Sequence, residues 1–203
     1  MKPHTIQTIC VYCGSADDLQ PVYHLAARQL GKTLAESGIQ LIYGAGKTGL
    51  MGVVADSVLQ HGGKVTGVVP ENLNQPQLIH AGLTSLEVTP DIQTRQRRMM
   101  EMADAMIALP GGFGTFYELL ESLTWAQIGV HHKPIGVLNI NGYFDPFLVM
   151  LEHARLEGFI YPEHLDLLIR ADSAEGILEE LGKYSPPPLL SRWIDRDTHE
   201  HSQ

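Results

Sequence analysis

The stretch AMIALPGGFGTFYE, residues 105–118, decides the fold of this chain. It opens with an uninterrupted apolar run, which is typical of a β-strand covered on both faces of its sheet. Three glycines follow, and after them apolar residues recur at helical spacing. A strand, a glycine turn and a helix in this order form the unit from which parallel α/β sheets are built.

The same alternation continues on both sides of this stretch. Apolar, β-rich runs occupy residues 8–13, 39–43, 65–69, 86–89, 105–109 and 135–139. Helical patterns occupy residues 23–37, 50–61, 92–102, 115–128, 146–156 and 173–181. The order predicts an α/β protein with a doubly wound parallel sheet in a single domain, residues 1–182. Residues 183–203, which include three consecutive prolines, are predicted to form an extended or partly disordered C-terminal tail.

Composition narrows the classes of function. The 203 residues are 44% hydrophobic and 18% charged, as in ordinary globular proteins. Fourteen basic residues face 23 acidic ones, so the net charge is −9, and an acidic surface disfavours nucleic acid as a partner. No apolar run approaches the roughly 20 residues of a membrane span, and the N-terminus lacks the apolar core of a signal peptide. We therefore expect a cytoplasmic protein with neither nucleic-acid nor membrane partners.

Two cysteines, Cys10 and Cys13, form a C-x-x-C motif. A redox motif of this kind stands at the start of a helix, whereas here it lies in a strand-like run. Zinc would require two further ligands at suitable spacing. We expect two free strand cysteines and no metal, and we interpret the neighbouring pair His131-His132 as surface residues.

Ligands of doubly wound sheets bind beyond the carboxyl ends of the strands, where three glycine loops are expected. The first is Gly14-Ser15, whose hydroxyl suits a phosphate or a ribose. The second, residues 44–49, resembles the end of a P-loop, but Leu41 stands where that motif requires glycine. It does match G-x-G-x-x-G, which leaves a nicotinamide dinucleotide as one alternative.

The third loop, residues 110–115, leads directly into a helix and is the strongest candidate anion site, because successive backbone N–H groups there can surround a phosphate. Thr115 and Glu118 also match a capping box, so a purely structural role for Glu118 remains open. Arg95 favours the functional interpretation. It shares a helical stripe with Met99 and Met102, and an arginine on a buried stripe needs an anionic partner.

Arg95-Gln96-x-x-Met99, followed by Pro110-Gly111-Gly112-x-Gly114-Thr115-x-x-Glu118, closely resembles the paired signatures of the Lonely Guy (LOG) family. These are cytokinin riboside 5′-monophosphate phosphoribohydrolases, formerly labelled lysine decarboxylases, with the signatures R-K-x-x-M and P-G-G-x-G-T-x-x-E. The resemblance extends from the first strand to about residue 160.

The resemblance implies a Rossmann-like fold, a homodimer and a nucleoside 5′-monophosphate substrate. Cytokinin riboside 5′-monophosphates and AMP would be cleaved at the N-glycosidic bond to the free base and ribose 5-phosphate, without a cofactor. The catalytic pair would be Arg95 and Glu118, and a carboxylate in that place would stabilise an oxocarbenium-like sugar or activate water. The candidate substrate-binding residues are Gly14, Ser15, Gly44, Gly46, Met99, Gly111, Gly112, Phe113, Gly114, Thr115 and Thr124.

Four positions depart from the family pattern. Gln96 replaces a lysine, Ala45 the middle glycine of a G-G-G run, Gln77 a common glutamate, and Tyr117 the first glutamate of a frequent pair.

Two further functions are alternatives to the phosphoribohydrolase. One is a non-enzymatic nucleotide-binding or molybdenum-cofactor-carrier-like protein, and the other is an NAD-dependent oxidoreductase. Lysine decarboxylation fits least, because no convincing lysine for pyridoxal phosphate is found.

Overall fold

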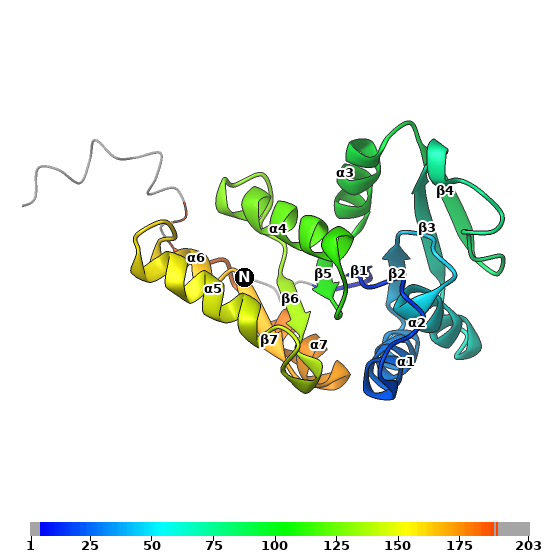
Figure 1. The fold of residues 1–203 in the computed structure, drawn as a ribbon, viewed down its shortest axis with the longest axis horizontal. Helices are drawn as coiled ribbons and strands as arrows, with labels where there is room; N and C mark the ends of the chain where they lie inside the picture. The colour runs from blue at the N-terminus through cyan, green and yellow to red at the C-terminus, as the bar shows by residue number, and fades with distance from the viewer. Residues whose placement is uncertain (1–4, 189, 191–203) are drawn as a thin grey trace, which may run out of the picture.

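The computed structural model describes residues 5–188 and 190. They form one sheet of seven parallel strands in the order β4-β3-β2-β1-β5-β6-β7, shown in Figure 1. The strands are β1 (Thr8–Tyr12), β2 (Gln40–Tyr43), β3 (Val65–Pro70), β4 (Ser85–Thr89), β5 (Ala105–Ala108), β6 (Ile135–Leu138) and β7 (Leu168–Ala171). The predicted doubly wound α/β fold is confirmed.

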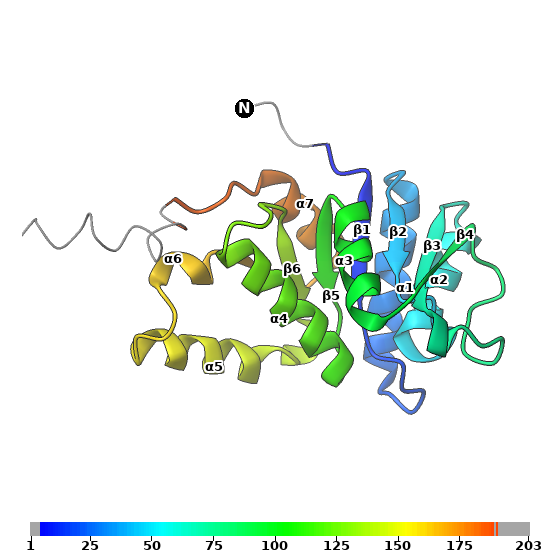
Figure 2. The same ribbon diagram turned by 90° about the horizontal axis from the view of Figure 1, so that it is seen from above.

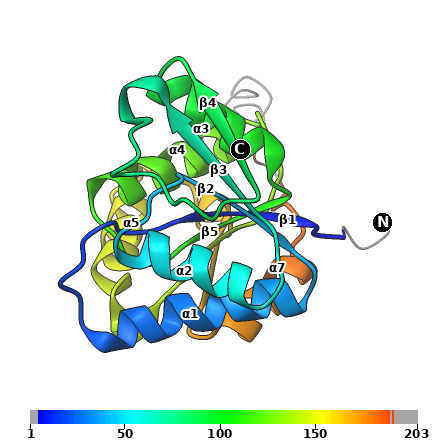
Figure 3. The ribbon, with the colours of Figure 1, turned by 90° about the vertical axis from the view of Figure 1, so that its right-hand side faces the viewer.

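Helices cover both faces of the sheet, as Figure 3 shows. The first face carries α1 (Pro21–Glu36), α2 (Gly49–Gln60) and α7 (Ala174–Lys183). The second carries α3 (Ile92–Met102), α4 (Phe113–Gln127), α5 (Asp145–Leu156) and the single turn α6 (Pro162–Leu165). Each face therefore buries its own core against the strands.

The strand sequences explain why two cores form. In β1, Ile9 and Val11 pack into the core beneath α1 and α2, while Cys10 and Tyr12 pack into the core beneath α3 and α4. Alternate side chains of a strand point to opposite faces, so a strand covered on both sides needs apolar residues at every position. The continuous apolar runs predicted as strands have this cause.

Three differences separate the observed elements from the predicted ones. Strand β7 was not predicted, because it is short, half-exposed and at the edge of the sheet. Helix α6 was not predicted, because it is a single turn that begins at Pro162. Helix α4 begins at Phe113 rather than at residue 115, since Gly112 acts as its N-cap and Gly114 is part of its first turn. The last difference moves the start of the helix into the glycine loop.

The connection between β3 and β4 contains no α-helix. Residues 71–84 form a short 3-10 turn, Glu71–Leu73, and then an irregular segment that follows the edge of the molecule (Figure 2). An isolated β-bridge joins Gly46 to Ile79, and the Lys47 amide donates to the Leu78 carbonyl at 3.0 Å. We call residues 71–84 the cover segment, because it borders the cavity described below.

The strand order reverses between β1 and β5. The chain moves outward from β1 to β4, then returns through α3 to place β5 on the other side of β1. The loops after β1 and β5 meet there, and the Gly14 amide donates to the Pro110 carbonyl at 3.0 Å. A reversal of this kind leaves a crevice at the carboxyl ends of the strands, where ligands of such folds bind.

The predicted C-terminal tail lies partly outside the described residues. Leu190 is buried in the core beneath α4 and α5, so this part of the tail packs on the domain. Residues 189 and 191–203 lie outside the structure's description, and the division at residue 182 remains a prediction. In the described part of the chain, no helix is both long enough and apolar enough to cross a membrane.

Candidate active site

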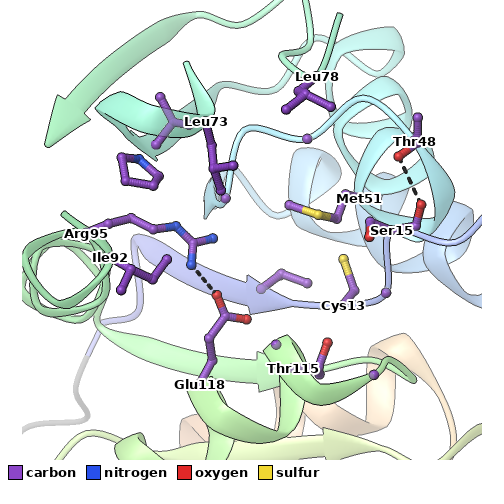
Figure 4. A pocket seen from close by; sticks show the side chains of 18 of the residues that line it. Cys13, Ser15, Thr48, Met51, Leu73, Leu78, Ile92, Arg95, Thr115 and Glu118 are labelled. Carbon is purple, nitrogen blue, oxygen red and sulfur yellow. Dashed lines mark hydrogen bonds and ion pairs between the residues drawn. The ribbon is translucent and has the colours of Figure 1, made fainter. Parts of the chain in front are cut away.

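A cavity of about 430 Å³ occupies the crevice between β1 and β5 (Figure 4). Its size falls within the range usual for small-molecule sites. Loops after β1, β2, β3 and β5 supply most of its lining, together with α3 and α4. The site is therefore assembled from the carboxyl edge of the sheet, as the fold predicts.

Arg95 from α3 and Glu118 from α4 meet in this cavity. Arg95 Nη1 donates to Glu118 Oε1 at 2.6 Å, and both side chains are only 10% exposed. Arg95 Nε also donates to the Val68 carbonyl of β3 at 3.2 Å, which fixes the guanidinium against the sheet. Removing one partner from such a buried pair typically costs about 3–5 kcal/mol, because the other charge stays buried.

Gly44 makes room for the guanidinium. A Cβ atom at this position would lie 1.9 Å from Arg95 Nη2, far inside van der Waals contact. Glycine after β2 is therefore needed so that the backbone can approach the arginine closely. The second glycine loop thus contributes to the site through Arg95 as well as through its place in the lining.

Burial raises the pKa of Glu118 above its ordinary value of 4.5. The positive charge of Arg95 and its hydrogen bond oppose this effect, and the nearby Glu121 adds to it. A carboxyl group taken out of water favours its neutral form, which moves its titration toward neutral pH. Such a carboxyl suits general acid–base chemistry.

The first turn of α4 offers its backbone N–H groups to the cavity. Gly112 is the N-cap, and no side chain caps the helix. Gly112, Phe113, Gly114 and Thr115 all line the cavity. Glu118 bonds to Arg95 instead of to the helix start, so the capping-box alternative is wrong. Unpaired amides at a helix N-terminus attract anions, and a phosphate fits here.

The N-terminus of α2 is used differently. The Gly49 amide donates to Asp17 Oδ1 at 2.9 Å, and the Leu50 amide donates to the Gly14 carbonyl at 2.9 Å. A dinucleotide motif needs these amides for its pyrophosphate. Because the chain's own acceptors occupy them, the G-x-G-x-x-G pattern here serves the contact between α2 and the loop after β1.

The far end of the cavity is apolar. The cover segment contributes Leu73, Leu78 and Ile79, and α3 contributes Ile92. Figure 4 shows Leu73 and Leu78 on one side of the Arg95–Glu118 pair and Thr115 on the other. The cavity therefore suits a molecule with an anionic group at one end and an apolar group at the other.

The structure brings together most of the predicted site residues. Those that line the cavity are Gly14, Ser15, Gly44, Gly46, Arg95, Gly112, Phe113, Gly114, Thr115 and Glu118. Gly111 lies just behind this surface, where a Cβ atom would come 2.0 Å from Thr115 Oγ1. Met99 is fully buried in the core and Thr124 is exposed on α4, so both lie away from the cavity.

Several lining residues were not predicted. They are Val11, Cys13, Thr48, Met51, Val69, Pro70, Leu73, Leu78, Ile79 and Ile92. For those on strands and in the loops after them, the sequence offered a general indication, because ligands bind at the carboxyl ends of strands and these residues stand there. The cover segment carried none, because an irregular connection has no periodicity to reveal which side chains face inward.

The cysteines and the histidine pair take no part in a metal cluster. Cys10 and Cys13 are free and buried, and burial raises the pKa of both thiols, so they stay protonated at neutral pH. Among the described residues, no three His, Cys, Asp or Glu side chains are grouped to hold a metal ion. His131 is half-buried, which lowers its pKa to about 4 and keeps its ring neutral.

Comparison with known proteins identifies the family. A family profile described as "Possible lysine decarboxylase" matches residues 51–181. The chain is 44% identical over 180 residues to a probable cytokinin riboside 5′-monophosphate phosphoribohydrolase, LOGL5 of rice (Oryza sativa subsp. japonica), covering 89% of this chain and 73% of LOGL5. The chain belongs to the LOG family.

Two further LOG relatives match to the same degree. LOG of rice is 44% identical over 192 residues, covering 94% of this chain and 79% of LOG. LOG7 of Arabidopsis thaliana is 43% identical over 179 residues, covering 88% of this chain and 82% of LOG7. Both are named cytokinin riboside 5′-monophosphate phosphoribohydrolases. The resemblance of the two sequence signatures is thereby confirmed.

Solved structures show the same fold at lower identity. A molybdenum cofactor binding protein from Rippkaea orientalis matches with a TM-score of 0.66 and 21% identity, covering 89% of this chain and 98% of that protein. A Moco carrier protein from Chlamydomonas reinhardtii matches equally well, with a TM-score of 0.66 and 21% identity over 88% of this chain and 97% of that protein. At this identity the likeness establishes the fold alone.

Proposed function

We propose that the chain hydrolyses the N-glycosidic bond of cytokinin riboside 5′-monophosphates and AMP. Water would add to C1′ of the ribose as the bond to the base breaks, and the products would be the free base and ribose 5-phosphate. The observation that carries the proposal is the Arg95–Glu118 pair between the open N-terminus of α4 and the apolar cover segment. The family also supports the proposal, because its members LOG and LOG7 are named for this activity.

Each group has a distinct role in the proposed reaction. The amides of Gly112 to Thr115 bind the 5′-phosphate, whose binding energy orients the ribose. Glu118 faces the anomeric carbon, where a carboxylate stabilises the oxocarbenium-like transition state or accepts a proton from water. Arg95 holds Glu118 in place and favours its ionised form, because its positive charge opposes the rise in pKa that burial causes.

The apolar end of the cavity would receive the base. Leu73, Leu78 and Ile79 present aliphatic side chains to it, which suits a purine with an apolar substituent. Among the described residues that line the cavity there is no lysine, so the site provides no Schiff-base partner for pyridoxal phosphate. Lysine decarboxylation is therefore not supported, and fold likeness alone does not favour the carrier alternative.

The test is incubation of purified protein with AMP or isopentenyladenosine 5′-monophosphate, followed by chromatography for the free base. Glu118→Gln should lower kcat by about 10²–10⁴-fold, the usual contribution of one general base. The surface variant Glu101→Gln is the control and should keep wild-type activity. Absence of free base from every nucleoside monophosphate, or full activity of Glu118→Gln, contradicts the proposal.

We also propose a homodimer in the cytoplasm. Helix α4 carries an exposed stripe at helical spacing, formed by Phe113, Tyr117, Leu120, Thr124 and Ile128. Phe113 is 95% exposed, which is unusual for phenylalanine in a folded chain and fits burial by a second copy. The predicted contact of Thr124 with substrate would then be made in the partner's cavity.

The proposed cytoplasmic location rests on the cysteines. Cys10 and Cys13 are free and buried, which is compatible with a reducing compartment.

A further inference from the structure

Tyr143 lies directly behind the glycine loop of the site. It follows the 3-10 turn Ile140–Gly142 and stands just before α5. Its hydroxyl donates a hydrogen bond to the Gly111 carbonyl. Its ring meets Tyr23 edge-on with a centroid distance of 6.0 Å and Phe144 edge-on at 5.1 Å. The ring is thus held by two aromatic neighbours while the hydroxyl reaches the loop.

Three successive carbonyl groups of the glycine loop each accept a hydrogen bond. The Pro110 carbonyl accepts from the Gly14 amide at 3.0 Å, and the Gly112 carbonyl accepts from the Phe116 amide at 3.0 Å. Between them, the Gly111 carbonyl accepts from Tyr143. The two outer bonds are made between backbone groups and need no particular side chain, whereas the central bond is made by a side chain.

The central bond fixes the direction of one N–H group. The Gly111 carbonyl and the Gly112 amide belong to a single planar trans peptide, so they point in opposite directions. With the carbonyl directed at Tyr143, the Gly112 N–H is directed away from it, and Gly112 borders the main cavity. The orientation of an anion-binding amide therefore depends on the tyrosine hydroxyl.

This peptide has few steric restraints on its Gly112 side. Both flanking residues are glycine, and a Cβ atom at Gly112 would meet nothing within 4 Å. A second cavity of about 330 Å³, bordered by Gly111, Tyr23 and Tyr143, gives the carbonyl space to rotate. A glycine–glycine peptide without a fixed carbonyl loses orientational order, because glycine populates most backbone conformations.

We propose that Tyr143 is a positioning residue for the phosphate site: it holds the Gly111–Gly112 peptide so that the Gly112 N–H faces the 5′-phosphate. This inference rests on the proposed function only in naming the phosphate as that of a nucleotide. Tyr143 is not among the residues that line the main cavity, so we expect its effect to fall on phosphate affinity rather than on bond cleavage.

The test is Tyr143→Phe, which removes the hydroxyl and keeps the ring. The KM for AMP and the inhibition constant of inorganic phosphate should rise together by about 3- to 10-fold, the worth of one hydrogen bond. We expect kcat to stay within about twofold. The melting temperature should change by less than about 4 °C, because both ring contacts remain. Tyr23→Phe is the matched control and should leave phosphate affinity unchanged.

Phosphate binding is also measured by titration calorimetry on the full chain, which needs no turnover. Wild-type affinity for phosphate in Tyr143→Phe overturns the inference, as does an equal loss in Tyr23→Phe or a loss of kcat at constant phosphate affinity. Wild-type protein that binds no phosphate also overturns it. Wild-type protein that binds phosphate but releases no base contradicts the proposed function alone, and the calorimetric comparison still decides the role of Tyr143.

Discussion

Gly44 shows how a single hydrogen atom in place of a side chain maintains the ion pair of the site. Gly44→Ala would place a methyl group 1.9 Å from Arg95 Nη2, so the guanidinium must shift, and we expect its hydrogen bond to Glu118 to be strained or lost. We expect kcat/KM for AMP to fall at least about 10-fold, since misplacing a catalytic group by about 1 Å can cost two orders of magnitude. Steady-state kinetics checks this.

The control for this change is Gly182→Ala. A Cβ atom at Gly182 meets nothing within 4 Å, and the residue lies in α7, far from the site in sequence. This substitution should leave activity unchanged and raise the free energy of unfolding by about 0.5–1 kcal/mol, because alanine favours the helix. Equal activity of the Gly44→Ala and wild-type enzymes would show that Arg95 does not need this space.

Ala45 is held in a conformation that favours glycine. Its φ angle is 64°, in the left-handed region, although the residue carries a side chain. A left-handed residue other than glycine costs about 1–2 kcal/mol. Ala45→Gly should therefore raise the free energy of unfolding by about 1 kcal/mol in urea denaturation. The control is Ala35→Gly, inside α1, which should lower the free energy of unfolding by a similar amount. A lower free energy of unfolding in both variants would contradict the strain at Ala45.

The pH dependence of the reaction should reflect the raised pKa of Glu118. Activity that needs the ionised carboxylate is lost as pH falls through that pKa, so the acid limb of kcat/KM should have its midpoint above 4.5. The sign for stability is opposite. The folded state holds this proton at higher pH than the unfolded state, so Glu118 makes the free energy of unfolding decrease as pH rises between the two pKa values.

This pH prediction is checked by rate profiles and by urea titrations between about pH 4 and pH 8. In Glu118→Gln this position no longer titrates. The free energy of unfolding of the variant should therefore lack the part of the pH dependence that Glu118 causes in the wild type. An acid limb centred at or below 4.5 would contradict the burial argument, whatever the absolute rate.

At the residue scale, part of the site was predictable from the sequence. The helical stripe indicated that Arg95 is buried and needs an anionic partner, and the family resemblance paired it with Glu118. The structure places Arg95 Nη1 2.6 Å from Glu118 Oε1. Tyr143 was missed, because the residue that fixes the Gly111 carbonyl comes 32 positions later and no local pattern links the two. The left-handed conformation of Ala45 was missed as well, since its sequence neighbours are compatible with several turns.

Among the elements, the cover segment is the least supported by regular structure. His80 secures it: Nε2 lies 2.9 Å from Asp56 Oδ1 of α2, and Nδ1 accepts from the Gly82 amide at 3.0 Å. His80→Ala removes both contacts. We expect KM for AMP to rise several-fold and amide exchange in residues 75–82 to quicken, because locally unsupported segments open first.

Mass spectrometry of deuterium uptake checks the cover segment directly. Lys32→Ala, which removes an exposed pair with Glu36 on α1, is the control and should change neither quantity. Unchanged exchange in His80→Ala would mean that the β-bridge between Gly46 and Ile79 suffices to hold the segment.

The elements themselves were largely predictable, with boundaries within a few residues. Strands buried on both faces are unbroken apolar runs, and α3 was predicted with the bounds that the structure shows. The misses were β7, which is short and half-exposed, the single turn α6, and the start of α4, where glycines conceal a helical turn. Glycine has low helix propensity, so a first turn containing it looks like loop in sequence.

For the whole molecule, the exposed stripe on α4 predicts self-association. Leu120→Asp places a charge in the middle of this stripe, where leucine is 41% exposed. A dimer buried on this face should dissociate, because an unpaired charge in an apolar interface is costly. Analytical ultracentrifugation should show a dimer for wild type and a monomer for Leu120→Asp.

The control is Leu25→Asp, a substitution of a leucine that is 65% exposed on α1, on the opposite face of the sheet. It should remain dimeric. A wild-type protein that sediments as a monomer at micromolar concentration, or a Leu25→Asp variant that alone dissociates, would contradict the assignment of the interface to α4.

The helix-free connection between β3 and β4 can change in sequence without altering the rest of the site. Replacement of residues 71–84 by the equivalent stretch of a homologue would exchange the apolar wall of the cavity and leave Arg95, Glu118 and the amides of α4 untouched. We therefore predict that chimaeric enzymes that differ only in this stretch diverge in the base they release while sharing one way of cleaving the bond.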